Sequence, residues 1–115
     1  MGQYFLIANL DRKEYIDPPL KKLWEIAVNP EIGGILAYLL ATDNPDGTGL
    51  YLKWMNNELK WFGKWCGDRI ALIGDYGKQA PNFKKVRINY NAVIAAFKDI
   101  TDEVIEEYLD FLKRK

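Results

Sequence analysis

Apolar and polar positions along the chain predict a small, largely antiparallel sheet. The apolar run from Ile70 to Ile73 lies between two Gly–Asp turn pairs, which is typical of an interior strand buried on both faces. Val86, Ile88 and Tyr90 alternate with polar residues, as in a half-exposed edge strand. Together with an apolar stretch at the start of the chain and a fourth stretch in the middle, the predicted strands are residues 3–10, 60–65, 69–74 and 85–90.

The stretch 50–65 is open to two interpretations. Its apolar residues share one face if it is helical, whereas Trp61 and Trp65 share one parity if its end is a strand. A glycine interrupts either pattern. We favour a helix over residues 50–59 and then a strand that turns at a Gly–Asp pair into the apolar run, because Gly–Asp is a common two-residue hairpin turn.

Four to five helices are predicted to pack on this sheet, which makes the fold class α+β. Asp17 with Pro18, and Asn29 with Pro30, each combine a capping side chain with a proline suited to the first helical position. The helix 30–41 is apolar nearly all round and is predicted to be buried in the core, over the two apolar strands. The helix before it should bury one face, made of Leu20, Leu23, Trp24 and Ala27.

Composition narrows the class of protein. At 115 residues and 49% hydrophobic residues the chain predicts one globular domain over residues 1–115. Sixteen basic residues balance 16 acidic ones, so net charge does not support nucleic-acid binding, and no apolar run is long enough for a membrane span. The chain has no histidine and a single cysteine, Cys66, which we expect to be buried. These features predict a cytoplasmic protein that needs no cofactor.

Several short motifs resemble a known family of small uncharacterised proteins. Members begin Met-Gly-x-Tyr and carry a Trp-x-Gly-Asp-x-Ile…Gly-Asp-Tyr core, which matches Tyr4, Trp65, Asp68 and Asp75 and the residues around them. Such proteins are found in bacteria, phages and archaeal viruses, so the resemblance implies a phage or viral association and a host cytoplasm. The match is strongest over residues 1–40 and 63–77, and departs from the pattern at Pro18-Pro19 and at 50–59. The resemblance implies no activity.

One candidate binding site combines cations with aromatic rings. Lysine and tryptophan are interleaved at Lys53-Trp54, Lys60-Trp61 and Lys64-Trp65, a combination that suits stacking on bases and pairing with phosphates. The alternative is ordinary packing, with tryptophans in the core and lysines in water, and a third interpretation is an aromatic dimer surface. With the polar pair that opens the next strand, the candidate binding residues are Lys60, Trp61, Lys64, Trp65, Asp68 and Arg69.

The second candidate is a carboxylate metal site. Asp68 and Asp75 flank the strand 69–74 and lie too far apart to share one ion, so each needs a carboxylate from elsewhere, such as Asp11, Asp43 or Asp46. The alternative is that the two aspartates accept hydrogen bonds in their turns while Arg69 makes a salt bridge. A convergent cluster would favour a metal-dependent hydrolase or nuclease.

Interaction is the function that the sequence favours over catalysis. The chain lacks a histidine base, a phosphate-binding loop, paired cysteines and a nucleophile motif. We therefore predict a non-enzymatic interaction protein, forming a homo-oligomer or recognising a protein or nucleic acid, with the metal-dependent hydrolase as the alternative.

Overall fold

Two compact units make up the structure. The computed structural model describes residues 3–42, 51–76 and 81–113. One unit is built from the segments 1–29 and 68–101, and the other from 30–67 and 102–115. We call them the sheet unit and the helical unit and describe each by itself. The expectation of one domain over residues 1–115 stays a prediction.

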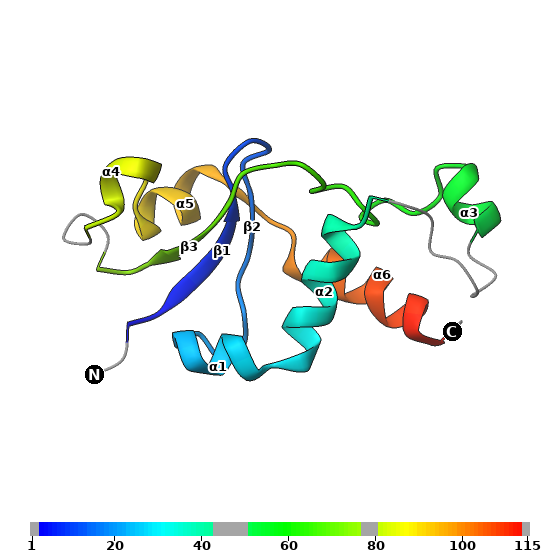
Figure 1. Cartoon of the computed structure of the whole chain (residues 1–115), viewed down its shortest axis with the longest axis horizontal. Coiled ribbons are helices and arrows are strands. Elements are labelled where there is room, and N and C mark those ends of the chain that lie inside the picture. Colours follow the sequence, from blue (N-terminus) through cyan, green and yellow to red (C-terminus); the bar gives the residue numbers. More distant parts are fainter. Residues whose placement is uncertain (1–2, 43–50, 77–80, 114–115) are drawn as a thin grey trace. The chain divides into compact units, whose positions relative to one another are not determined.

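A four-stranded sheet in the order β3–β1–β2–β4 forms the centre of the sheet unit. Figure 1 labels β1, β2 and β3 of this sheet. β1 pairs antiparallel with both β2 and β3, and β2 pairs parallel with β4. The predicted α+β class with a largely antiparallel sheet is therefore confirmed. The strands are β1 (Phe5–Asn9), β2 (Glu14–Ile16), β3 (Ile70–Gly74) and β4 (Lys98–Asp99).

One core cluster of the sheet unit lies on the sheet face that includes Leu6, Ala8 and Ile73, and Ile7 and Ile16 are buried on the other face. Val93 of α5 (Tyr90–Ala96) is fully buried against these residues. Before α5 comes the short helix α4 (Phe83–Val86), and the Asn89 side chain caps α5 by accepting a hydrogen bond from a backbone N–H. The partly buried residues around this core are Leu10, Ala71, Val86, Ile88, Tyr90 and Phe97.

The helical unit is formed by α2 (Pro30–Leu40), α3 (Tyr51–Met55), the turn segment 60–67 and α6 (Thr101–Lys113) from Asp102 onward. Tyr38 of α2 packs its ring against Phe62, Tyr108 and Phe111 at centroid distances of 5.1, 6.0 and 5.2 Å. Gly34 lies under the Tyr108 ring, at a place that any side chain would fill. The residues buried in this unit include Ile32, Ile35, Leu39, Trp61, Trp65 and Val104.

Two predicted strands are wrong. Residues 60–65 form turns, because Gly63 adopts a positive φ of 69°, a conformation that an extended strand does not allow. Its N–H donates to Tyr38 O at 2.8 Å. Residues 85–90 pass from the end of α4 to the start of α5, and Arg87 is left-handed at φ 60°. Their alternation arises from a helix end followed by a short extended link.

The predicted burial of β3, of α2 and of the helix before α2 is also wrong. β3 is an edge strand, because only β1 pairs with it among the described residues, and its Leu72 is 44% exposed. α2 buries one face only and leaves Leu40 39% exposed.

The preceding helix, α1 (Leu23–Val28), buries only Ile26, and its Trp24 is 65% exposed. The helix was predicted to start at Asp17 and Pro18, but it starts at Leu23. At this start the Lys22 N–H donates to Glu25 Oε1, whereas Asp17 forms an ion pair with Lys21 instead of capping a helix.

Candidate functional site

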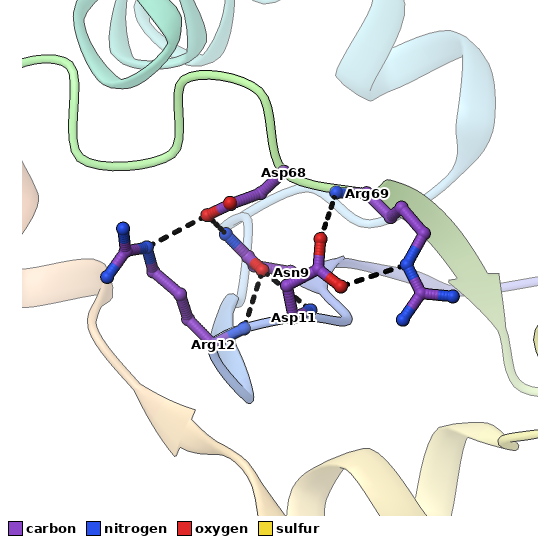
Figure 2. Close-up of polar contacts among 5 residues, drawn as sticks. All are labelled: Asn9, Asp11, Arg12, Asp68 and Arg69. Carbon is purple, nitrogen blue, oxygen red and sulfur yellow. Dashed lines mark hydrogen bonds and ion pairs between the residues drawn. The ribbon is translucent and has the colours of Figure 1, made fainter.

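A polar cluster joins the β1–β2 turn to the start of β3 (Figure 2). The Asn9 side chain lies at its centre and is fully buried. Its Oδ1 accepts hydrogen bonds from the backbone N–H groups of Asp11 and Arg12, both at 2.9 Å. Its Nδ2 donates to Asp68 Oδ2 at 2.9 Å. One asparagine therefore both forms the turn and fastens it to residues 59 positions later in the chain.

Two ion pairs flank this asparagine. Arg12 Nε lies 2.8 Å from Asp68 Oδ2, and Arg69 Nε lies 2.9 Å from Asp11 Oδ1. The Arg69 N–H also donates to Asp11 Oδ2 at 2.7 Å. This backbone bond, with the Arg69 guanidinium, lowers the pKa of Asp11. Figure 2 shows the two guanidinium groups on opposite sides of the cluster, so their charges do not converge on one ligand.

Arg69 makes a salt bridge, which was the predicted alternative to a role in a functional site. The Asp75 carboxylate accepts a backbone N–H as expected, but at 3.2 Å from Tyr4, beside the neighbouring strand, rather than from its own turn. Asp68 differs, since side chains rather than backbone groups donate to it. Three candidate binding residues, Lys60, Asp68 and Arg69, form ion pairs, and the Arg69 side chain is the most exposed of the three, at 74%.

The lysine and tryptophan residues of the segment 60–65 lie in the helical unit. Trp61 and Trp65 are only 2% and 0% exposed. Lys60 Nζ and Lys64 Nζ lie over the Trp61 ring, 5.2 and 4.1 Å from its centroid. The arrangement matches packing of tryptophan in the core, and stacking of a base on either ring would require the turn to open.

Cys66 follows this segment and is exposed, so the prediction of a buried cysteine is wrong.

The metal-site candidates do not come together in the described part of the chain. Asp68 precedes β3 and accepts a hydrogen bond from the Asn9 side chain. Asp75 follows β3 and accepts one from the Tyr4 N–H. Residues 3–42, 51–76 and 81–113 contain no group of three or more His, Cys, Asp or Glu side chains able to hold a metal ion. Asp43 and Asp46 lie outside the described residues. The metal-dependent hydrolase therefore stays a prediction.

Glu107 of the helical unit accepts four hydrogen bonds, and sequence reasoning missed it. Its Oε2 accepts the Tyr38 hydroxyl at 2.6 Å and the N–H groups of Trp61 and Phe62 at 2.9 and 3.2 Å. Its Oε1 accepts the Lys60 N–H at 2.9 Å. Burial of Tyr38 and the hydrogen bond that its hydroxyl donates to Glu107 raise the pKa of Tyr38 far above its usual value. The carboxylate fastens the turn segment to α6, and most of its accepting capacity is used within the unit.

The outer edge of β3 is the feature with unused binding capacity. At the two ends of the β1–β3 ladder, Leu10 N–H donates to Arg69 O and Asp75 N–H to Tyr4 O, both at 2.9 Å. Hydrogen-bonded pairs alternate along an antiparallel ladder, so the residues between them that face β1 are Ala71 and Ile73.

It follows that Ile70, Leu72 and Gly74 direct their N–H and C=O groups away from β1. No hydrogen bond to these groups is found among the described residues. The sequence marks this segment as a strand, but nothing local to it shows that one side stays open.

A cavity of about 230 Å³ lies beside this edge within the sheet unit. Gln3 and Asn82 supply amide groups to a lining that is otherwise mainly apolar. Its apolar side chains come from β1, β3, α4 and the link after α4: Phe5, Leu72, Ile73, Phe83, Val86 and Ile88. The cavity can take an apolar side chain brought to the edge by another strand.

Comparisons with known proteins give no match: no family model, no curated protein and no solved structure is similar to the chain. The resemblance to small bacterial and viral proteins stays a prediction. None of the described helices has the length and apolar character needed to cross a membrane.

Proposed function

We propose that this protein is a non-enzymatic interaction module that binds an extended protein segment along the open edge of β3. The observation that carries the proposal is the row of outward N–H and C=O groups on Ile70, Leu72 and Gly74. An added strand satisfies such groups through main-chain hydrogen bonds, and neighbouring pockets select its side chains. The cavity beside β3 supplies such a pocket.

The two edges of the sheet differ in a way that supports this proposal. Proteins protect sheet edges by making them short or by placing charged residues or proline on them. The edge strand β4 has two residues, Lys98 and Asp99, and both are charged and exposed. β3 has five residues, Ile-Ala-Leu-Ile-Gly, with neither a charge nor a proline. One edge is protected against pairing and the other is suited to it.

Short synthetic peptides of alternating threonine and valine, with lysine at both ends, test the proposal. Amide NMR shifts and hydrogen exchange report whether the outward amides of Ile70, Leu72 and Gly74 become protected. We expect protection in the wild-type protein and its loss in Leu72→Pro, which removes one outward N–H and leaves the bonds to β1 in place. Leu72→Ala, which keeps that N–H, is the matched control and should retain binding. The proposal is wrong if neither these peptides nor further copies of the protein protect the three amides.

A further inference from the structure

We infer that the extended segment bound by β3 is β3 of a second copy of this chain, paired antiparallel with Leu72 opposite Leu72. This inference rests on the proposed function, because it names the partner of the same edge. The result is a two-fold symmetric dimer in which two four-stranded sheets become one continuous sheet.

Hydrogen-bond geometry restricts the possible registers. Only residues that direct their backbone groups outward can form the new hydrogen-bonded pairs, and these are Ile70, Leu72 and Gly74. With Leu72 on the two-fold axis, Ile70 of each copy pairs with Gly74 of the other, so all the outward groups are used. A slide by one hydrogen-bonded pair in either direction leaves one residue of each copy unpaired.

Charge selects the same register. Counting outward from Leu72, Arg69 of one copy lies opposite Asp75 of the other, and the same pair recurs at the other end of the ladder. Opposite charges that face each other across an antiparallel pair stabilise it. The Arg69 side chain is 74% exposed, and Asp75 is also exposed. A slide of the register would place Arg69 opposite an apolar residue or beyond the ladder. The strand is therefore complementary in charge to itself.

Apolar side chains meet across the new ladder. Ile70 of the second copy lies opposite Gly74, where the Gln3 amide and the Phe5 ring cover the glycine, so its side chain would pack on these two groups. The two Leu72 side chains, each 44% exposed in one copy, face each other at the centre of the new ladder. Cross-strand apolar contact would remove both from water.

Sedimentation velocity over micromolar to millimolar concentrations tests the dimer. We expect wild-type protein to self-associate, and Leu72→Lys or Leu72→Glu to weaken self-association at least about tenfold, because like charges then face each other on the axis. An equimolar mixture of the two variants should associate again, as lysine faces glutamate. Leu109→Lys is the matched control, because Leu109 is 43% exposed but lies on α6, and it should associate like wild type.

Disulfide trapping provides a second measurement in case a charged variant is unstable. In a Cys66→Ser background, Leu72→Cys should form a covalent dimer on oxidation, whereas Ile70→Cys should not, since Ile70 faces a glycine. A monomer that still binds the threonine–valine peptides overturns the self-pairing and leaves the proposed function standing. Self-association that is unaffected at position 72 also overturns it. A monomer that binds no peptide overturns both.

Discussion

Replacing Glu107 by glutamine should destabilise the helical unit far more than its small change in shape suggests. The carboxylate accepts hydrogen bonds from the Tyr38 hydroxyl and from the N–H groups of Lys60, Trp61 and Phe62. A hydrogen bond to a charged group contributes about 1.5–3 kcal/mol, and a neutral one about 0.5–1.5 kcal/mol. Glutamine in the best orientation keeps the three bonds to Oε2 as neutral bonds and leaves the exposed Lys60 N–H to water.

Losing about 1 kcal/mol at each of three bonds lowers the free energy of unfolding by about 2–3 kcal/mol in Glu107→Gln. The assay is urea unfolding followed by tryptophan fluorescence, because Trp61 and Trp65 are buried in the same unit. Glu103→Gln is the matched control. Its carboxylate makes an exposed ion pair with Lys60 at 3.3 Å, so its loss should cost less than about 0.5 kcal/mol. Equal stability of the two variants would refute the assignment of Glu107 as the fastening group.

Three further changes test separate parts of the structure. Burial and a hydrogen bond raise the pKa of Tyr38, so the native state keeps a proton that the unfolded chain releases above about pH 10, and this group should lower stability above that pH by up to about 1.4 kcal/mol per unit. Tyr38→Phe should make the fall less steep in alkaline urea titrations, and the remainder should come from Tyr15 and Lys21, whose pKa values are also raised. Gly63→Ala should cost at least about 1 kcal/mol more than Gly67→Ala in thermal unfolding, because both have positive φ but only a Cβ at Gly63 meets a carbonyl oxygen, at 2.7 Å. Asn9→Ala should lower the free energy of unfolding by about 2–4 kcal/mol, measured by urea unfolding, and a loss below about 1 kcal/mol would contradict its central place in the polar cluster.

Local patterns were sufficient for the elements whose own residues decide their structure. The apolar runs predicted β1 and β3, and the Asn29-Pro30 start predicted α2. They failed where a distant residue decides. The turn at 60–67 depends on Glu107, which lies more than 40 positions later and has no sequence feature that marks its role. A short period-two alternation likewise cannot separate an edge strand from the link between α4 and α5.

The candidate site was predictable only in part. Asp68 and Arg69 were identified from their turn position, but their partners Asn9, Asp11 and Arg12 belong to another turn, and only the β1–β3 pairing brings the two turns together. Nor can a single sequence show which strand of a sheet is left without a second neighbour. Order within a sheet is a property of the whole chain, so the open edge of β3 was missed.

The order of the strands also bears on how the chain folds. β1 and β2 form a local hairpin, whereas the β1–β3 ladder ends in contacts such as that between Tyr4 and Asp75, 71 residues apart. Such long-range pairing is slow, because a large loop must close before any contact forms. Until it closes, β1 presents an unpaired edge of its own, and β3 from a neighbouring chain can fill it as well as β3 from the same chain. The topology therefore permits strand exchange between copies during folding, distinct from pairing between finished molecules.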